Sequence, residues 1–285
     1  MMGAASLELG VPTRYVAVLR CFAAAGDEVV VPAPSWPVYD RRLTAIGAAI
    51  RRVPLARAET AYAYSADDLL AAVGPATRLV VVCTPNNPTG NTMPAADLER
   101  IAGTGVPLLV DNAYVDFDAP GAGAASMELV RRFSNVLVAR TFAKAYALAG
   151  LRLGYVVADP ATADFVDRLA VPGWSAGGPA LAAGLAALED EAYARVHVNE
   201  VVHERGRLLE ALRAAGLPAL DSAGNFVAVA GDEVPGGPDA VVAAFLAQGI
   251  LIRSMGGVAR ITVGHRPVND AVLAAIPAVA QALRA

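Results

Sequence analysis

The stretch RTFAKAYALAGLRLGY, residues 140–155, contains Lys144, the single lysine of a chain that has 23 Lys and Arg residues. A bias in codon usage can replace surface lysines with arginine, but it does not explain why one lysine stays here. Lysine can lose its proton when it is buried and can then attack a carbonyl group, whereas arginine stays charged. Lys144 is therefore a candidate covalent catalyst, with chance survival of one lysine as the alternative.

Working outward from this stretch, short apolar runs alternate with helix-like segments through the first half of the chain. Runs rich in Val and Leu are typical of buried strands, and those predicted here span 28–32, 78–85, 106–114 and 135–142. Helical patterns lie between them, for example at 13–26 and 95–105. A repeated strand–helix–strand order predicts an α/β fold, with a mainly parallel sheet sandwiched by helices.

The pattern changes after Pro179. A long helical stretch at 179–216 is followed by a strand-like segment, NFVAVAG, a helix near 238–249 and a strand at 259–264. We interpret this half as a smaller α+β domain. The Gly- and Pro-rich stretch 171–179 is typical of a domain boundary, so we expect a large domain over 1–175, and an interdomain helix with a small C-terminal domain over 176–285.

The charge of the chain and the arrangement of its apolar residues argue against two classes of partner, nucleic acids and membranes. The net charge of −4 and the absence of a basic run argue against a nucleic-acid partner. The hydrophobic content of 55% raises the question of a membrane span, but the longest uncharged stretch, 169–188, contains two prolines and four glycines. We interpret it as a loop followed by a helix that begins near Pro179. No signal peptide, metal-ligand spacing or disulfide framework is evident, so we expect a cytoplasmic protein without membrane contact or bound metal.

Polar groups follow three of the predicted strands. Asn87 lies after the second strand, Asp111 ends the third, and Thr141 and Lys144 follow the fourth. Ligands of parallel sheets bind at the carboxyl ends of strands. The sequence therefore predicts a binding site at this edge of the sheet.

Together these motifs resemble a known family. TPNNPTG (84–90), DNAY (111–114) and TFAKAYALAGLRLGY (141–155) look like the fold-type-I pyridoxal-phosphate (PLP) aminotransferases of class I/II, in particular the histidinol-phosphate aminotransferase-like branch. GDEVVVPAPSWPVYD (26–40) and ARITVG (259–264) fit the same pattern. Each motif alone is weak, but their order and spacing are specific, and the resemblance covers nearly the whole chain. It implies the PLP-transferase fold type I and a homodimer.

The resemblance assigns roles to the residues at the strand ends. Lys144 matches the Schiff-base lysine, which also transfers a proton during the reaction. Asp111 matches the carboxylate that holds a proton on the pyridine nitrogen. Asn87 and Tyr114 match the groups that hydrogen-bond the phenolic oxygen. The alternatives are ordinary turn roles for Asn87 and Asp111.

Further positions match the groups that hold phosphate and substrate. Arg152 and Thr141 match phosphate ligands, and Trp36 matches the aromatic residue that stacks on the cofactor ring. Arg260 matches the arginine that binds the substrate carboxylate, with Arg253 as a weaker anion-binding candidate. The alternatives are purely structural roles: a surface arginine for Arg152, a core or interface tryptophan for Trp36 and a salt-bridge partner for Arg260.

The N-terminal turn departs from the family pattern. Gly10, Val11 and Thr13 fall where relatives have a small polar turn that binds phosphate with backbone N–H groups, and Pro12 has no N–H to offer. Ala143 stands where close relatives often have serine. Family members usually carry an N-terminal arm over the active site before this turn, and we do not expect residues 1–9 to form it.

The resemblance implies transfer of an amino group between an amino acid, or an amino-phosphate, and a 2-oxo acid. Two alternatives remain open at this stage. One is another PLP reaction on the same scaffold, such as that of a decarboxylase, lyase or amino-acid oxidase. The other is a catalytically weakened PLP-binding homologue, which the altered phosphate turn favours and the retained Lys144 and Asp111 oppose.

Overall fold

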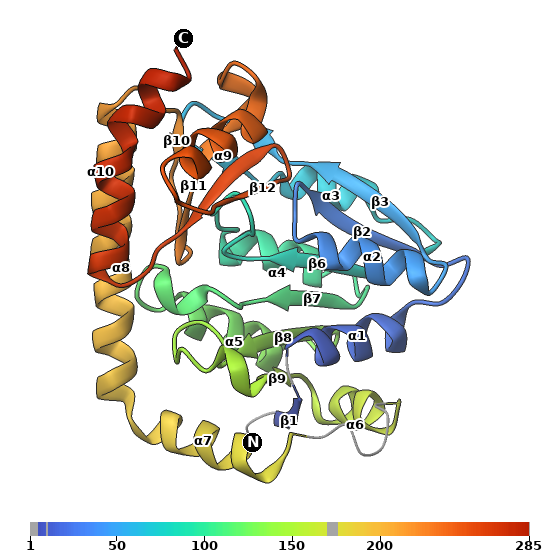
Figure 1. The fold of residues 1–285 in the computed structure, drawn as a ribbon. Helices are drawn as coiled ribbons and strands as arrows, with labels where there is room; N and C mark the ends of the chain where they lie inside the picture. Colours follow the sequence, from blue (N-terminus) through green and yellow to red (C-terminus); the bar gives the residue numbers. More distant parts are fainter. Residues whose placement is uncertain (1–4, 10, 170–175, 285) are drawn as a thin grey trace.

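The computed structural model describes residues 5–9, 11–169 and 176–284, with side chains from residue 17 onward. Within these ranges the strands form three sheets: one of seven strands, one of four and a two-stranded hairpin (Figure 1). The predicted α/β architecture is confirmed, and each of the four strands expected in the first half is present.

The seven-stranded sheet has the strand order β1-β9-β8-β7-β6-β2-β3. Neighbours from β3 to β8 run parallel, whereas β9 is antiparallel to both β8 and β1. Its strands are β1 (Ala5–Leu9), β2 (Glu28–Ala33), β3 (Ala49–Pro54), β6 (Thr77–Cys83), β7 (Leu108–Asp111), β8 (Val136–Thr141) and β9 (Leu153–Val157).

Helices cover both faces of this sheet, which explains why its central strands are continuous apolar runs. Along β6, Leu79 and Val81 pack in one core with α1, α2 and α6, while Val80 and Val82 pack in a second core with α3, α4 and α5. These helices are α1 (Val11–Phe22), α2 (Pro37–Ala45), α3 (Ala66–Ala72), α4 (Ala95–Ala102), α5 (Ala122–Arg132) and α6 (Pro160–Leu169). Short 3-10 turns are η1 (Val115–Phe117), η2 (Ala149–Leu151) and η3 (Gly231–Glu233).

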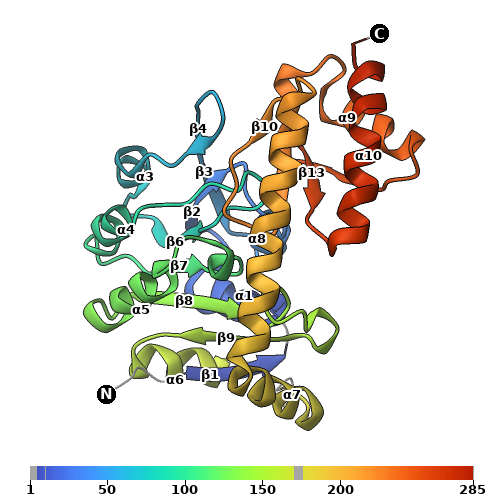
Figure 2. The same ribbon diagram turned by 90° about the vertical axis from the view of Figure 1, so that its left-hand side faces the viewer.

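The predicted long helical stretch is two helices, α7 (Gly178–Glu189) and α8 (Glu191–Ala214), so the expectation of one uninterrupted helical pattern is corrected. They separate at Asp190, whose side chain accepts a hydrogen bond from the backbone N–H of Tyr193 at 3.1 Å. Asp190 therefore caps α8. Figure 2 shows α8 running from α7, beside the large sheet, to the second sheet.

The second sheet is antiparallel, with the order β10-β11-β13-β12. Its core lies between this sheet and the helices α8, α9 and α10. The elements are β10 (Ala219–Leu220), β11 (Phe226–Ala230), α9 (Gly237–Ala247), β12 (Arg253–Met255), β13 (Val258–Thr262) and α10 (Arg266–Ala282). A separate sheet and core agree with the smaller α+β half expected from the sequence, while the division at residue 175/176 stays a prediction.

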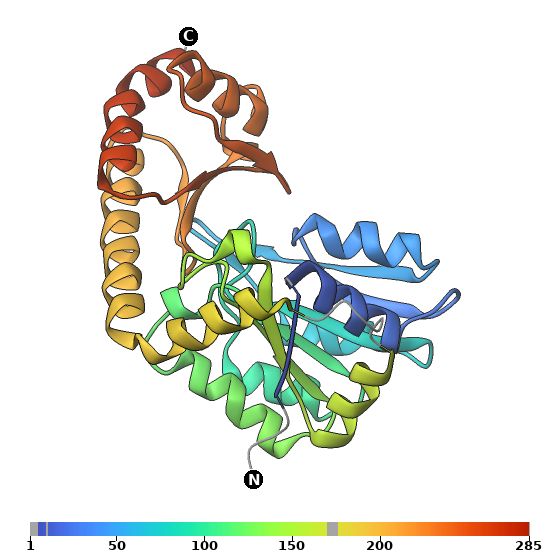
Figure 3. The same cartoon turned by 60° about the horizontal axis from the view of Figure 1, so that its bottom comes forward.

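Contacts from several elements join the two halves. Arg205 on α8 donates from Nη1 to the carbonyl oxygens of Phe117, at 3.0 Å, and Gly224, at 2.8 Å. The hairpin of β4 (Ala56–Arg57) and β5 (Tyr62–Ala63) reaches the second half through Thr60, whose hydroxyl donates to Asp221 at 2.8 Å. The tip of the β12–β13 hairpin, at Gly256, approaches the large sheet, as Figure 3 shows.

In the part of the chain that the structure describes, no helix combines the length and the apolar character needed to cross a membrane.

Candidate active site

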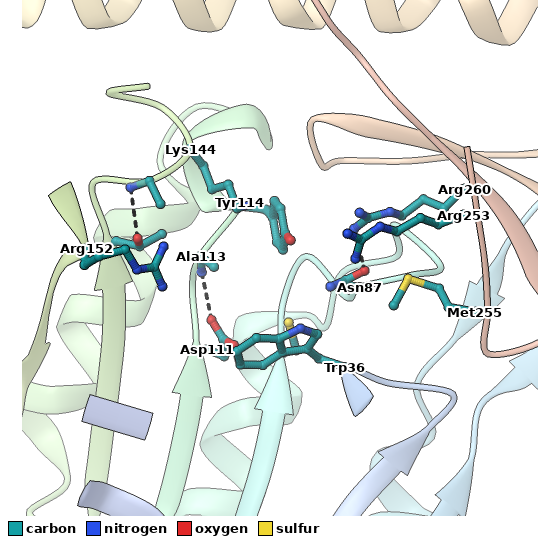
Figure 4. A pocket seen from close by; sticks show the side chains of 13 residues that line it. Trp36, Asn87, Asp111, Ala113, Tyr114, Lys144, Arg152, Arg253, Met255 and Arg260 are labelled. Carbon is teal, nitrogen blue, oxygen red and sulfur yellow. Dashed lines mark hydrogen bonds between the residues drawn. The ribbon is translucent and has the colours of Figure 1, made fainter. Parts of the chain in front are cut away.

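A cavity of about 260 Å³ opens at the carboxyl ends of β6, β7 and β8, between the large sheet and the β12–β13 hairpin (Figure 4). The sheet order makes these three strands neighbours, and parallel pairing brings their ends to one edge. The predicted residues that line the cavity are Trp36, Asn87, Asp111, Tyr114, Thr141, Lys144, Arg152 and Arg260. The structure therefore brings all eight of them together.

Asp111 is the last residue of β7 and is only 2% exposed. Its Oδ1 accepts a hydrogen bond from the backbone N–H of Ala113 at 3.0 Å, and its Oδ2 accepts one from the Tyr39 hydroxyl. Hydrogen bonds to the ionised form favour a buried carboxylate over the neutral acid. The cavity thus has a buried negative charge at its floor.

Lys144 lies three residues after β8 and is largely buried. Burial lowers the pKa of its ammonium group, and the positive charges of Arg260, Arg152 and Arg253 lower it further, while Asp111 opposes the shift. Its Nζ lies 5.5 Å from the centre of the Tyr114 ring. A lower pKa increases the fraction of neutral amine, which is the nucleophilic form.

Tyr114 closes the cavity on the side of Lys144. Its ring packs edge-on against Phe226 of the second sheet, with centroids 5.3 Å apart. Burial raises the pKa of its hydroxyl, and the nearby Arg260 partly offsets this. Tyr114 is therefore a neutral hydrogen-bond donor at the pH of the cell.

Arg152 lies on the other side of Lys144 (Figure 4), and Thr141 also lines the cavity. Arg152 adopts a left-handed backbone conformation, with φ of +55°, and its Nη1 donates to the carbonyl of Ala149 at 3.0 Å. Its side chain is exposed and lines the cavity. Non-glycine residues with positive φ cluster at functional sites because the strain has to be compensated by the surroundings.

Thr141, the last residue of β8, accepts a hydrogen bond at Oγ1 from the backbone N–H of Ala143 at 2.9 Å. This contact fixes the turn that leads to Lys144. The Thr141 hydroxyl and the Arg152 guanidinium together offer donors to an anion on this side of the cavity.

Two arginines form the opposite wall. Arg253 on β12 and Arg260 on β13 are partners in the antiparallel register, and Figure 4 shows their guanidinium groups side by side. Arg260 Nη1 donates to Asn87 Oδ1 at 2.8 Å, whereas Arg260 Nε is buried without a hydrogen-bond partner. A buried donor without a partner costs free energy, so a ligand that supplies an acceptor here gains that energy back.

Trp36 lies at the start of α2, where Pro37 occupies the first turn and fixes the entry of the chain into the helix. Its ring packs edge-on against Tyr39, with centroids 5.4 Å apart and an interplanar angle of 89°. In Figure 4 the indole lies beside Asp111 at the floor of the cavity. This is where an aromatic ligand ring would stack.

The N-terminal turn lies at the edge of the residues that the structure describes. Gly10 lies outside the described residues, and Val11 and Thr13 are placed in α1 by their backbone only. Their predicted contact with phosphate stays a prediction.

Sequence reasoning missed several residues of the site. Cys83 and Met255 line the cavity, and the buried Tyr39 reaches Asp111 from α2. Tyr39 follows Trp36 by three residues in a helix that the sequence pattern did not reveal. The spacing i, i+3, which puts two side chains on one face of a helix, was the available signal.

Comparison with known proteins identifies the family. The family model described as "Aminotransferase class I and II" matches residues 13–276. The chain belongs to this family.

Curated proteins that are similar in sequence are also named as aminotransferases. The aminotransferase is 36% identical to the histidinol-phosphate aminotransferase of Paramagnetospirillum magneticum over 90% of this chain and 72% of the relative. It is 38% identical to the aromatic amino acid aminotransferase of Rhodococcus jostii over 87% of this chain and 68% of the relative.

Solved structures show the same fold. The histidinol-phosphate aminotransferase of Sinorhizobium meliloti, in complex with pyridoxal-5'-phosphate, superimposes with a TM-score of 0.88 at 29% identity. The match covers 98% of this chain and 77% of that one. The aminotransferase therefore has fold type I, and its chemistry is PLP-dependent transamination.

The cavity of the aminotransferase fits this cofactor. It combines a partly buried amine, Lys144, with a buried carboxylate, Asp111, and is lined by an exposed guanidinium, Arg152, and a buried hydroxyl, Thr141. The unpaired Nε of Arg260 adds an unmet donor on the opposite wall. Lys144 suits the cofactor aldehyde and Asp111 suits the basic ring nitrogen. Arg152 and Thr141 suit the phosphate, and Arg260 suits the substrate carboxylate.

Proposed function

We propose that the cavity around Lys144 is the active site, and that it transfers the amino group of an amino acid or amino-phosphate that carries a planar side chain to a 2-oxo acid. The observation that carries the proposal is the position of Lys144, whose pKa is lowered by burial and by nearby arginines, close to the buried Asp111. When bound, PLP supplies the aldehyde that captures the substrate amine and the ring that accepts electrons from the α-carbon.

Lys144 and the residues around it each have a separate role in the proposed reaction. Lys144 Nζ would bond covalently to the cofactor aldehyde with release of water and, as a free amine, would take the proton from the substrate α-carbon as a general base. Asp111 accepts a hydrogen bond from the protonated ring nitrogen. Asn87 and the neutral hydroxyl of Tyr114 hydrogen-bond the phenolic oxygen.

Residues farther from the Lys144 amine bind and orient the cofactor and the substrate. Arg152 and the Thr141 hydroxyl bind the phosphate, together with Gly10, Val11 and Thr13 at the start of α1. The indole of Trp36 stacks on the cofactor ring. Arg260 binds the substrate's anionic group, since its Nε has no partner within the protein.

The substrate class follows from the wall opposite Lys144. Arg253 places a second guanidinium beside Arg260, and Met255 adds an apolar surface. A ring packs on such a surface, while two guanidinium groups suit a phosphate or a second carboxylate. Relatives named for histidinol phosphate and for aromatic amino acids support substrates of this kind.

We also propose that the aminotransferase is a cytoplasmic homodimer, with the domain boundary near residue 175, in line with its family resemblance. Light scattering of the holoenzyme measures the oligomeric state. A monomeric mass in an active preparation would contradict the dimer.

Two experiments test the function. Borohydride reduction followed by peptide mass spectrometry should place one cofactor on Lys144, and Lys144→Ala should carry none. Single-turnover absorbance with histidinol phosphate, phenylalanine, tyrosine and aspartate should then identify the amino donor by loss of the bound-cofactor absorbance, with appearance of the 2-oxo product. Release of carbon dioxide or peroxide instead would identify another PLP reaction, and a protein that cannot be loaded would overturn the proposal.

A further inference from the structure

The Asp111 carboxylate is held in part by a hydrogen bond from a residue outside the ligand-contacting part of the site. A carboxylate that is 2% exposed loses most of its hydration, and its charge then depends on the donors that replace water. Its contacts include two hydroxyl or N–H donors. The backbone N–H of Ala113 binds Oδ1 at 3.0 Å and comes from the same strand end, whereas the Tyr39 hydroxyl binds Oδ2 and comes from α2, 72 residues away in sequence.

Tyr39 is held rigidly. Its side chain is 1% exposed and packs in the core between α2 and the large sheet. Its ring also contacts Trp36 edge-on. Because Pro37 starts the helix between these two residues, one turn of chain fixes both the stacking indole and the phenol hydroxyl. The hydroxyl therefore has little freedom to leave Asp111.

Three other titratable groups lie around Asp111, and one of them, the Cys83 thiol, also hydrogen-bonds the Asp111 carboxylate. Cys83 on β6, Tyr64 after β5 and Tyr114 all respond to the Asp111 charge, and burial keeps each of them neutral. Tyr64 donates its hydroxyl to the carbonyl of Cys83. The Asp111 charge in turn raises the pKa of Lys144, which lines the same cavity.

We propose that Tyr39 is a positioning residue, which orients the Asp111 carboxylate and keeps it ionised for the cofactor's ring nitrogen. The proposal rests on the function proposed above. Each carboxylate oxygen can accept two hydrogen bonds, so the tyrosine contact on Oδ2 leaves room for the ring nitrogen. By fixing one lone pair of Oδ2, Tyr39 determines the direction in which the remaining ones point.

Tyr39→Phe is the decisive variant because it removes the hydroxyl and keeps the ring that packs on Trp36. Tyr64→Phe is the control: it also removes a hydroxyl from a tyrosine whose pKa responds to the Asp111 charge, but this tyrosine is partly buried and its hydroxyl bonds to a backbone carbonyl. Any loss that is common to both variants reports general destabilisation of the core. Thermal unfolding of both proteins measures that loss directly.

The first measurement needs no cofactor. Carbon-13 NMR of aspartate carboxyls in the cofactor-free protein, with the Asp111 signal assigned by Asp111→Asn, follows the protonation of this group. Loss of a hydrogen bond to the ionised form should move its titration midpoint upward by about one pH unit in Tyr39→Phe, and by much less in Tyr64→Phe. An unchanged midpoint in Tyr39→Phe would overturn the proposal.

The second measurement uses the holoenzyme. In Tyr39→Phe, kcat should fall about tenfold, with KM for the amino donor within about twofold, and the pH titration of the bound-cofactor absorbance should shift. Equal kcat in Tyr39→Phe and parent would overturn the proposal even if the carboxyl midpoint moved. If the parent itself binds no PLP, the proposed function fails, and the NMR result still reports whether Tyr39 controls the charge of Asp111.

Discussion

Arg260 Nη1 donates to Asn87 Oδ1 at 2.8 Å, which joins strand β13 of the second sheet to the loop after β6 of the first. The two residues are 173 positions apart in sequence. The group proposed to bind the substrate anion is thereby held against a group proposed to bind the cofactor. Binding of substrate and placement of cofactor are consequently linked through one hydrogen bond.

Replacement of Arg260 should weaken substrate binding. We expect Arg260→Ala to lower kcat/KM for the amino donor by about 10- to 100-fold, mostly through KM, because a charge-assisted hydrogen bond contributes about 1.5–3 kcal/mol. Steady-state kinetics measures this. Arg131→Ala, which removes an exposed guanidinium paired with Glu128 on α5, serves as the control. A KM that stays at the parent value in Arg260→Ala would exclude Arg260 from the anion site.

Replacement of Lys144 should stabilise the cofactor-free protein at neutral pH. Burial lowers the Lys144 pKa in the folded state below its ordinary value of 10.5, so the unfolded chain binds more protons between the two values. Stability therefore rises with pH across that interval, and below it the charged amine carries the full cost of burial. We expect Lys144→Met to unfold roughly 2 °C higher than the parent at pH 7.

The advantage of Lys144→Met should shrink as the pH approaches 10.5. Thermal unfolding of both cofactor-free proteins across this pH range measures it. A variant that is less stable than the parent at pH 7 would show that Lys144 makes favourable interactions in the folded state that outweigh its burial.

The tip of the β12–β13 hairpin should tolerate no side chain at Gly256. A Cβ there would lie 2.7 Å from Pro34 Cβ and 3.1 Å from Pro88 Cγ, both in rigid rings, and would push Arg253 and Arg260 away from the cavity. We expect Gly256→Ala to raise KM for the amino donor about tenfold, since overpacking of this kind costs about 1–3 kcal/mol.

Gly257→Ala is the matched control for this variant. Gly257 also has a positive φ, of +82°, but a Cβ there meets nothing within 4 Å. Both variants therefore carry backbone strain, and only Gly256→Ala adds a steric clash. Similar KM values in the two would mean that strain, rather than contact with the prolines, controls the hairpin.

Acid sensitivity should depend on Glu204, a 1% exposed residue of α8. Burial by itself raises its pKa, but hydrogen bonds from Arg207, at 2.8 and 2.9 Å, and from Asn269, at 3.0 Å, bring the pKa below the ordinary value of 4.5. The resulting stability is present above pH 4.5 and is lost as the pH falls through the lowered value.

Glu204→Gln should therefore be less stable than the parent at pH 7, and the difference should narrow below pH 4.5. Urea unfolding at a series of pH values measures both effects. Glu200→Gln, an exposed position on the same helix, should leave stability within about 0.5 kcal/mol of the parent at every pH. A constant difference between Glu204→Gln and the parent would point to lost packing instead of lost charge.

The sequence predicted the parts of this molecule that repeat a simple pattern. Buried parallel strands are uniformly apolar, so β2, β6, β7 and β8 could be recognised from composition alone. Because the carboxyl ends of parallel strands lie at one edge of a sheet, the polar residues that follow these strands could also be placed together. Strand β3 was missed because most of its side chains are exposed and two of them are arginines, Arg51 and Arg52.

Contacts between distant segments could not be predicted. The hydrogen bond from Tyr39 to Asp111 depends on how α2 packs on the sheet, and the one from Arg260 to Asn87 depends on how the two halves meet. The break between α7 and α8 was missed because the helical pattern continues on both sides of Asp190. Arg152 lies within an apolar segment, and its residue type suggests neither its exposure nor its left-handed backbone.

The two hydrogen bonds from Arg205 Nη1 have a mechanical consequence. One nitrogen binds Phe117 of the first half and Gly224 of the second, so it ties the η1 turn to the segment before β11. The Gly256 tip contacts the opposite half at a different place, and the β12–β13 hairpin carries both cavity arginines. Removal of the Arg205 guanidinium would therefore leave the sheet that carries Arg253 and Arg260 with one contact fewer to the opposite half.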